Sequence, residues 1–427
     1  MRCYPSLVRL AGGCVGTLAG MSYVPPREIL ERYGEVMVNY GLGNGAGIER
    51  GDVVGVVCAE DAKPLLLEVA KAVWRAGGHL IVDFRPADDT DWNMQKAFYE
   101  IASDEQLDFY PDAYRRSYFA SIDHYLVLLA DRDPRSLAGL DPGRVSRHRR
   151  SRGRELAYRL QKTKAGSLSW SGCLYGTTAT AAEAGMSLEE YWEQIVHACY
   201  LDDPDPVSRW RATAAEIRHT VAWLNRLDIE RLHVVAEGTD LWVAVGEQRR
   251  WAGGESVNVP SFEIATSPDW RGTEGHITFS EPLYRSGAVI RGAWLRFERG
   301  EVVEASAQEG EAELKAMIAT DPGAARIGEF SLTDGRHSRV TRFMAHVLYD
   351  ENRGGPTGNT HLAIGNSMED LYTGDPASAT PEQLAALGFN TSRIHEDIVS
   401  TSDRTVTATL KDGSTKVIYA GGQFQTD

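Results

Sequence analysis

The spacing of apolar residues changes near residue 230, and this change limits the folds that are open to the chain. Before it, apolar runs at 53–57 and 79–84 flank a helical pattern at 61–75. A strand, a helix and a second strand in this order form a βαβ unit with parallel strands. After it, short β runs alternate with turns, which is typical of antiparallel sheets. These runs cover residues 232–235, 241–245, 276–279, 288–297 and 302–306.

We therefore predict an α/β N-terminal domain with parallel strands, followed by a mostly antiparallel β (α+β) domain. The length of 427 residues exceeds one ordinary hydrophobic core, which also favours two domains. We place them at 1–228, including a helical connector, and at 229–427. A third strand at 125–130 is expected to join the parallel sheet, whereas residues 132–185 are expected to be irregular.

The charge of the chain argues against a nucleic-acid partner. Its formal net charge is −15, and nucleic-acid binding needs a basic surface. The basic run at 144–164 is interpreted as a solvated helix face or a connector between domains. No Gly-x-Gly-x-x-Gly motif follows the first strand and no Walker A sequence occurs, so a nucleotide site is not expected. No apolar run is long enough for a transmembrane helix, so no membrane association is expected.

The cysteines point to a reducing compartment. There are five of them, and none forms a Cys-x-x-Cys pair. An odd number without such pairs favours a cytoplasmic protein. Residues 7–21 loosely imitate a signal peptide, but Arg9 and several glycines interrupt the apolar run. We interpret this stretch as an N-terminal extension.

The pair His395 and Asp397 is the first candidate for metal chemistry. The surrounding residues, Ile394-His395-Glu396-Asp397-Ile398-Val399, have the composition of a short strand. Residues two apart in a strand point to the same face, so the imidazole and the carboxylate are predicted to lie side by side. Such a pair suits a divalent cation. An isolated His-x-Asp pattern is also common on protein surfaces, so further ligands are needed to support the interpretation.

Three upstream segments supply them. Glu263 ends the segment Asn-Val-Pro-Ser-Phe-Glu, Glu329 follows Arg-Ile-Gly, and His361 begins His-Leu-Ala-Ile-Gly after Asp350-Glu351-Asn352. Glu263, Glu329 and His361 each adjoin apolar residues. A charged glutamate in such surroundings is costly unless it is paired or bound to a metal ion.

Taken in order, these motifs resemble those of the aminopeptidase T family, also called the thermophilic metalloprotease family. The series consists of Glu237-Gly238-Thr239-Asp240-Leu241, the Asn-x-Pro-x-x-Glu segment, Gly328-Glu329, Asp350-Glu351-Asn352, His361-Leu-Ala-Ile-Gly and the His-x-Asp pair. The resemblance covers most of the chain and is strongest from about residue 230 onward. It implies an N-terminal α/β domain and a largely β metal-binding domain.

The resemblance also implies an activity and a site. Family members hydrolyse N-terminal residues from peptides with two divalent ions, commonly zinc or cobalt; manganese and iron are further candidates. Carried over by motif, the metal ligands would be Glu263, Glu329, His361, His395 and Asp397, and one carboxylate would bridge the ions. A homodimer is implied as well. Two adjacent ions would bring the pKa of a shared water near neutrality.

Two positions depart from the family pattern. Phe262 precedes the first ligand, where the family often has an acidic residue or glycine. Met368 stands where the family usually has a tyrosine at the metals, and a thioether has no proton to donate. Tyr372 is the nearest possible replacement. Glu351 is a candidate acid or base, with a salt bridge in the same turn as the equal alternative.

These departures leave three hypotheses. The first is a cytoplasmic metallo-aminopeptidase that acts on peptides. The second is a divergent metal-dependent enzyme on the same scaffold, either a hydrolase of a small amide or a ring-cleaving dioxygenase with a single iron. The third is a binding protein that retains metal without turnover. The number and kind of bound ions would separate them, because two zinc or cobalt ions favour hydrolysis and one iron favours oxygen chemistry.

Overall fold

The N-terminal half is built on a parallel four-stranded sheet. The computed structural model describes residues 23–426 except 256–257, 286–287 and 376–377, so the expected N-terminal extension lies outside the described residues. The strand order is β2 (His79–Arg85), β1 (Val53–Ala59), β3 (His124–Leu129) and β4 (Ser169–Leu174). Each neighbouring pair is parallel. The predicted βαβ unit and the third strand are therefore confirmed.

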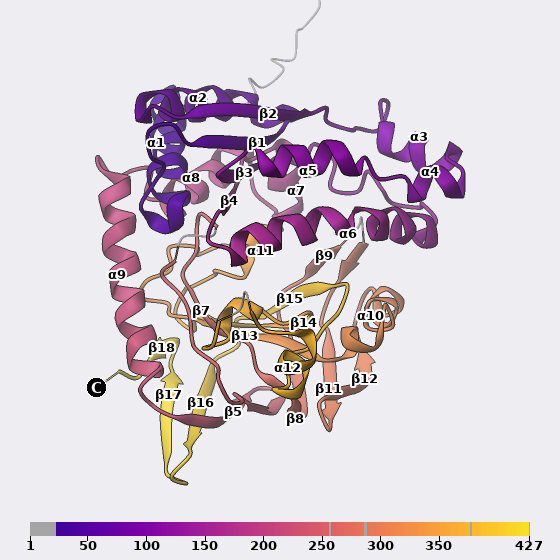
Figure 1. Cartoon of the computed structure of the whole chain (residues 1–427). Coiled ribbons are helices and arrows are strands. Elements are labelled where there is room, and N and C mark those ends of the chain that lie inside the picture. Colours follow the sequence, from indigo (N-terminus) through magenta and orange to yellow (C-terminus); the bar gives the residue numbers. More distant parts are fainter. Residues whose placement is uncertain (1–22, 256–257, 286–287, 376–377, 427) are drawn as a thin grey trace, which may run out of the picture.

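Helices cover both faces of this sheet (Figure 1). Val54 and Val56 of β1 face a core that includes residues of α1 and α2, whereas Val57 faces Tyr118 and Phe119 of α5. The helices of this half are α1 (Arg27–Val36), α2 (Lys63–Ala76), α3 (Met94–Ile101), α4 (Asp104–Asp108), α5 (Asp112–Ala120), α6 (Pro142–Lys164), α7 (Thr178–Glu183), α8 (Leu188–Ala198) and α9 (Pro206–Leu224).

Residues 132–185 are more ordered than predicted. They contain the long helix α6, the strand β4 and the helix α7. α6 lacks a continuous apolar stripe, and polar contacts attach it to the rest of this half instead. Arg147 forms ion pairs with Asp104 and Asp108, and Lys162 donates to the main-chain carbonyl of Phe119 at 3.0 Å. The basic run is thus a helix face, and much of its charge is already paired.

The chain changes to antiparallel pairing between α9 and β5, as predicted. The large sheet has eight strands, in the order β12-β11-β8-β6-β5-β16-β17-β18. Its strands are β5 (Ile229–Ala236), β6 (Thr239–Ala244), β8 (Asp269–Thr278), β11 (Trp294–Glu298), β12 (Glu301–Ser306), β16 (Arg404–Leu410), β17 (Thr415–Ala420) and β18 (Gln423–Phe424). The run at 288–297, expected to be one strand, is divided between β10 (Ala288–Ile290) and β11 by a turn. Domain limits at 228 and 229 stay a prediction.

A second antiparallel sheet of four strands carries the candidate ligands. Its order is β15 (His395–Ser400), β14 (Asn359–Gly365), β13 (Ile327–Thr333) and β7 (Glu263–Thr266). A separate hairpin pairs β9 (Leu283–Arg285) with β10. The helices of this half are α10 (Glu311–Ile318), α11 (Val347–Asp350) and α12 (Pro381–Ala386).

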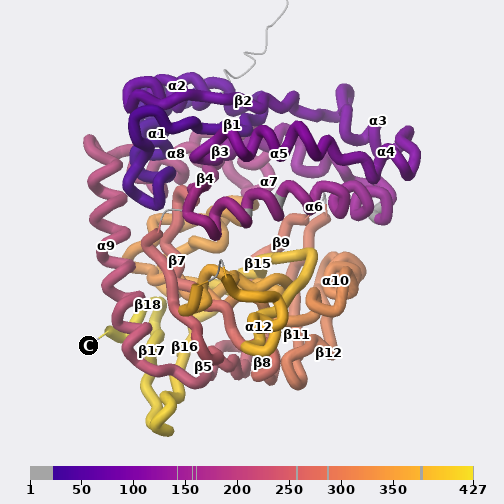
Figure 2. Tube along the Cα trace, viewed as in Figure 1, coloured from indigo at the N-terminus to yellow at the C-terminus, as the bar shows by residue number. Residues whose placement is uncertain are grey.

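The two halves contact each other above the four-stranded sheet that carries the candidate ligands, as the chain trace shows (Figure 2). The Val259 N–H donates to the carbonyl of Gly172 in β4 at 3.0 Å. Tyr191 of α8 donates to the carbonyl of Met344 at 2.9 Å, and Lys164 at the end of α6 pairs with Glu369. One buried core includes residues of both halves. The ligand sheet is therefore held against the N-terminal half by main-chain, side-chain and apolar contacts.

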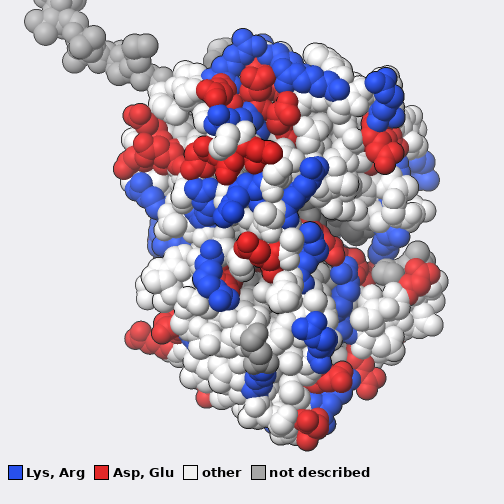
Figure 3. All heavy atoms as spheres, turned by 90° about the vertical axis from the view of Figure 1, so that its left-hand side faces the viewer, with Lys and Arg blue, Asp and Glu red and all other residues white. Residues whose placement is uncertain are grey.

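The surface in view carries charged side chains of both signs. On the face that α9 occupies, Lys and Arg are mixed with Asp and Glu and form no broad basic field (Figure 3). Among the described residues, no helix has both the length and the apolar character needed to cross a membrane.

Candidate metal centre

Strand register places the five predicted ligands on one face of the four-stranded sheet. Ala363 of β14 lies opposite both Glu329 of β13 and Asp397 of β15. His361 and Gly365 are two positions from Ala363 on β14, and Gly365 lies opposite His395. Alternation along a strand therefore brings Glu329, His361, His395 and Asp397 to the same face.

Glu263 reaches this face by the same geometry. It lies opposite Thr333, which is four positions from Glu329 on β13 and so shares its face. Small residues, Ala265 and Ala363 among them, occupy the same face between the ligands. The ligand side chains can therefore converge above the sheet.

The side chains do converge, around the carboxylate of Glu329. The Oε1 atom of Glu329 lies 3.2 Å from Nε2 of His361, and its Oε2 atom lies 3.1 Å from Nε2 of His395. Glu263 Oε2 is 3.3 Å from the same nitrogen of His361, and Asp397 Oδ1 is 3.5 Å from His395 Nε2. The chain thus has two sets of three donors, Glu263 with Glu329 and His361, and Glu329 with His395 and Asp397, each within 4.8 Å.

Main-chain carbonyls orient both imidazoles. His361 Nδ1 lies 3.3 Å from the carbonyl oxygen of Glu351, and His395 Nδ1 lies 2.8 Å from that of Asn366. A carbonyl only accepts hydrogen bonds, so Nδ1 carries the hydrogen in each ring. Both rings therefore present Nε2 to the centre, which is the usual arrangement for a histidine that binds metal.

The electrostatics of the site couple its acids to its bases. Burial raises the pKa of Glu263 to about 7, an effect that His361 opposes and Glu329 reinforces. Burial acts in the same direction on Glu329, but hydrogen bonds from His361 and His395 outweigh it and bring its pKa to about 2. Glu329 is thus charged at neutral pH although it is buried. Such a charge is stable only beside cations.

The donor set fits divalent cations. Oxygen and imidazole donors are ligands that zinc, manganese, cobalt and iron accept. Asp397 Oδ1 is buried and, within the described part of the chain, has no hydrogen-bond partner; its contact with His395 Nε2 at 3.5 Å is an ion pair only. A buried carboxylate oxygen without a hydrogen bond is costly unless another group, such as a metal ion, satisfies it.

The predicted acid or base, Glu351, is buried beside the ligands. It follows α11, its main-chain oxygen orients His361, and Asn352 Nδ2 lies 3.4 Å from its Oε1 atom. Burial raises the pKa of its carboxyl well above the ordinary value, and the charges of Glu263 and Asp397 add to the effect. The alternative of a salt bridge finds no support among the described ion pairs.

Tyr372 and Met368 lie on the segment that follows β14. The Met368 N–H donates to Ser267 Oγ at 3.1 Å, and this hydroxyl donates to the carbonyl of Gly328 at 2.6 Å. Met368 therefore lies close to the main chain beside Glu329. The Tyr372 ring instead packs against Phe389, with ring centroids 6.1 Å apart. The role of Tyr372 as a donor stays a prediction.

The structure shows what surrounds Phe262, the other departure from the family pattern. It also identifies Asn352 and Asn366 as positioning residues, a role that the sequence analysis did not assign. The Phe262 ring is buried and stacks on Trp210 with centroids 5.0 Å apart, while its N–H donates to Asn352 Oδ1 at 2.6 Å. These contacts fix the start of β7 and hence Glu263. Asn352 was part of the Asp-Glu-Asn motif, which offered a signal. Asn366 contacts His395 through its main-chain oxygen, so the residue type at this position gave no signal in the sequence.

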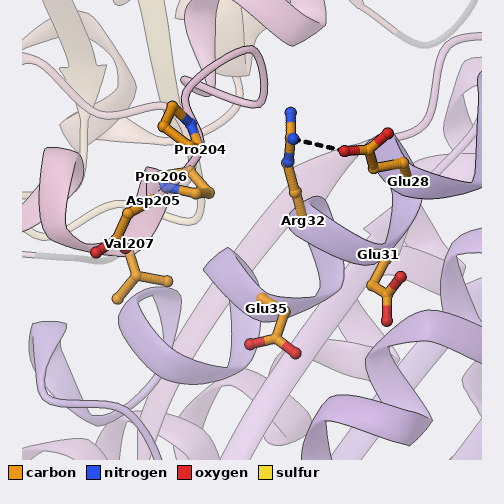
Figure 4. Close-up of a pocket in the computed structure, with 8 residues that line it drawn as sticks. All are labelled: Glu28, Glu31, Arg32, Glu35, Pro204, Asp205, Pro206 and Val207. Atoms are coloured by element: carbon orange, nitrogen blue, oxygen red, sulfur yellow. Dashed lines mark hydrogen bonds and ion pairs between the residues drawn. The ribbon is translucent and has the colours of Figure 1, made fainter.

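A surface recess lies away from this centre. A recess of about 300 Å³ lies between α1 and the start of α9 (Figure 4), lined by Glu28, Glu31, Arg32, Glu35, Pro204, Asp205, Pro206 and Val207. Three of its carboxylates are paired. Arg32 binds Glu28 at 2.6 Å, and Arg75 binds Glu31 and Glu35 at 2.9 Å each. This recess is therefore an ordinary ion-paired surface.

The fold joins a parallel α/β half to an antiparallel β half, and one sheet of the second half gathers two sets of candidate metal donors. Residues 27–424 match the thermophilic metalloprotease family (M29), and the chain belongs to this family. The family resemblance of the sequence motifs is therefore confirmed.

Individual relatives match over most of the chain. Aminopeptidase T of Thermus aquaticus is 30% identical over 70% of this chain and 76% of its own length. Aminopeptidase AmpS of Bacillus subtilis is 27% identical over 92% of this chain and 98% of its own length. The structure of wild-type AmpT from Thermus thermophilus superposes with a TM-score of 0.81 at 24% identity, covering 94% of this chain and all of that one, which confirms the fold.

Proposed function

We propose that this protein is a metal-dependent aminopeptidase that removes N-terminal residues from peptides with two divalent cations. The observation that carries the proposal is that two donor triads share Glu329. Its two oxygens point to different histidines, Oε1 to His361 and Oε2 to His395. One cation would be held by Glu263, Glu329 and His361, and the other by Glu329, His395 and Asp397. Membership of a metalloprotease family and aminopeptidase relatives support the same reading.

The chemistry divides between the cations and the protein. When bound, a pair of divalent cations lowers the pKa of a shared water and polarises the carbonyl of the scissile peptide. Hydrolysis breaks the C–N bond, and a proton from the attacking water must reach the leaving amine. Glu351 is the residue proposed to carry this proton, because its buried carboxyl has a raised pKa and lies within the field of Glu263 and Asp397. Tyr372 is the proposed hydrogen-bond donor to the oxyanion.

The finer properties follow from the same family. We propose zinc or cobalt as the working metal, with manganese or iron as alternatives, a peptide or small amide as substrate, and a homodimer as the assembly. A cytoplasmic location is supported by Cys58, Cys173 and Cys199, which are free and buried. These thiols are compatible with a reducing compartment.

The experiment combines metal analysis with a panel of aminoacyl-anilide substrates. The purified protein is stripped with a chelator, reloaded with zinc, cobalt, manganese or iron, and analysed for metal content and for release of the anilide. Two ions per chain and turnover that depends on reloading are expected. A matched panel of N-acetylated substrates tests the need for a free amino group, and equal hydrolysis of both panels would contradict an aminopeptidase.

Met368 favours one alternative, a divergent metal-dependent enzyme on this scaffold. Without the tyrosine usual at this position, a small-amide hydrolase or a ring-cleaving dioxygenase with one iron would also explain the site. The shared carboxylate favours two ions over one. A single redox-active iron per chain, with oxygen consumption and no anilide release, would establish the alternative instead.

A further inference from the structure

Strand β15, which carries His395 and Asp397, is an edge strand of the sheet of candidate ligands. Among the described strands it pairs with β14 alone. Residues 280–285, which end in β9, run along its other edge in the opposite direction, and Figure 1 shows β9 near β15. We call residues 280–285 the strap. Three contacts join the strap to β15 and the residue after it: Ser280 with Thr401, Glu281 with Val399 and Arg285 with Glu396.

The strap holds β15 through the main chain at one end and through a side chain at the other. The Glu281 N–H donates to the carbonyl of Val399 at 3.1 Å. Arg285 Nε donates to Glu396 Oε1 at 2.7 Å. Glu396 stands between the two ligands of β15, so its side chain points to the opposite face of the sheet. The strap therefore supports β15 at its edge and on the face behind the ligands.

The carboxylate of Glu281 joins β15 to a second segment of the chain. Its Oε1 atom accepts hydrogen bonds from Thr401 Oγ1 at 2.6 Å and from Ser280 Oγ at 3.3 Å. Its Oε2 atom accepts from Arg353 Nη1 at 2.7 Å. The Glu281 side chain is only 11% exposed, and hydrogen bonds to a carboxylate of this kind are stronger than those between neutral groups. One carboxylate thus connects the end of β15 with the turn that contains Arg353.

That turn also carries Glu351. The Arg353 N–H donates to the carbonyl of Asp350 at 3.2 Å. Asn359 Nδ2 donates to the carbonyls of both Glu351 and Arg353, at 2.9 Å and 2.6 Å. The carbonyl of Glu351 in turn orients His361. The positions of Arg353 and Glu351 are therefore coupled, and the carboxylate that holds Arg353 also constrains Glu351.

We propose that Glu281 is a positioning residue that sets the spacing between Glu351 and the second donor triad on β15. The inference rests on the proposed function, in which Glu351 passes a proton from the attacking water to the leaving amine. Proton transfer needs donor and acceptor atoms about 2.6–3.2 Å apart. A displacement of about 1 Å can cost on the order of a hundredfold in rate. Glu281 binds the turn of Glu351 with one oxygen and the end of β15 with the other, so it limits this displacement.

The first test varies the leaving group of the substrate. Glu281→Gln keeps the size of the side chain but removes the charge that holds Arg353. A para-nitroanilide releases a weakly basic amine, whereas a methylamide of the same amino acid releases a strongly basic one that depends on proton delivery. For the zinc-loaded variant, we expect kcat on the methylamide to fall about tenfold to a hundredfold. The loss on the nitroanilide should be much smaller.

Two further variants make this test specific. Arg353→Gln removes the other partner of the ion pair, so it should give the same selective loss, and the double variant should be no worse than either single one. Glu68→Gln is the matched control, because Glu68 is a buried glutamate that Lys71 binds at 2.8 Å in the N-terminal half. It should leave the ratio of the two rates unchanged. An equal loss on both substrates in Glu281→Gln is the result of a purely structural role and would overturn the proposal.

The second test needs neither metal nor activity. Hydrogen exchange of the main-chain amides is measured on the metal-stripped, full-length protein, because exchange reports local opening. Glu281→Ala should speed exchange in both β15 and residues 350–353, Thr401→Val in β15 alone, and neither should change it in β1. If wild type hydrolyses neither substrate, the proposed function fails, and exchange alone decides whether Glu281 links the two segments. Unchanged exchange in both segments of Glu281→Ala would overturn the proposal.

Discussion

Lys164, the last residue of α6, forms an ion pair with Glu369, which follows 205 positions later on the segment after β14. Glu369 is the direct neighbour of Met368, whose N–H is tied through Ser267 to the main chain beside Glu329. The pair therefore joins the N-terminal half to a segment that packs on the four-stranded sheet of candidate ligands.

Breaking this pair should affect catalysis more than stability. Both side chains are partly exposed, and pairs of this kind contribute about 0–1 kcal/mol. We expect Lys164→Ala and Glu369→Gln to leave the thermal midpoint within a few degrees of wild type and to raise KM several-fold on peptides. The double variant Lys164→Glu with Glu369→Lys should recover KM. Lys315→Ala, which breaks a pair within α10, is the control; a KM rise there of the same size would contradict the argument.

Removing His395 or Asp397 should remove metal without unfolding the protein. Each belongs to the second donor triad, and both lie on β15, outside the N-terminal half. We expect His395→Ala and Asp397→Ala to lose most bound metal and activity by elemental analysis and anilide assay. The control is His233→Ala, which disrupts another His–Asp pair, with 2.8 Å between Nε2 and Asp240 Oδ1, outside the site. Unchanged metal content in both site variants would count against the assignment.

Replacing Glu329 or Glu263 should change the number of bound ions differently. Glu329 belongs to both triads and Glu263 to one. Replacing either with Gln keeps the size but removes the charge that offsets the cation. We expect Glu329→Gln to weaken both ions and Glu263→Gln to leave about one ion per chain. Activity should fall at least about tenfold in each, which corresponds to roughly 1.4 kcal/mol. Wild-type occupancy and turnover in both variants would place these residues in an ordinary ion-pair network.

Met368 and Tyr372 can be distinguished by a pair of variants on aminoacyl-anilides. Loss of one oxyanion donor costs about a hundredfold to a thousandfold in kcat. If Tyr372 supplies the donor, Tyr372→Phe should lower kcat on that scale while metal content stays constant. If the donor has been lost, Tyr372→Phe should change little and Met368→Tyr should raise a weak peptidase activity. Strong wild-type turnover that neither variant alters would show that methionine only fills space at this position.

Asp350 should make stability depend on pH. Burial raises its pKa from 3.8 to about 7, although hydrogen bonds from the N–H groups of Met344 and His346 oppose the shift. Between these values the unfolded chain has lost the proton and the folded chain retains it, so stability falls as pH rises to about 7 and is then constant. The free energy of unfolding of wild type, measured by urea denaturation, should decline from pH 5 to 7 relative to that of Asp350→Asn, by at most about 1.4 kcal/mol per pH unit. Parallel curves for the two proteins would contradict this.

Local patterns predicted some parts of this site and not others. Strand alternation placed His395 and Asp397 side by side, because that relation depends on two residues of one strand. The convergence of Glu263 with His361 depends on the register of β7, β13 and β14, which no spacing in the sequence contains. Those ligands came from the ordered family motifs.

Two elements lie in a stretch that was expected to be irregular: α6, whose basic run was interpreted as a helix face or a connector, and β4, which was missed. α6 has few apolar residues, so the sequence shows no helical period of apolar side chains. Ion pairs and hydrogen bonds, such as those of Arg147 and Lys162, attach this helix instead. β4 is rich in serine and glycine, yet it is a parallel strand because β3 pairs with it along its length. In both, tertiary contacts override weak local signals.

The ligands also arrive late in the order of synthesis. Glu263, Glu329 and His361 can be paired before the ribosome reaches β15, but His395 and Asp397 complete the second triad only after nearly the whole chain has emerged. Domains fold in order from the N-terminus during translation. A nascent chain that stops before β15 therefore carries the scaffold and three of the five proposed ligands, but not the second donor triad. If these residues hold the metal, peptide cleavage is withheld until the protein is nearly finished.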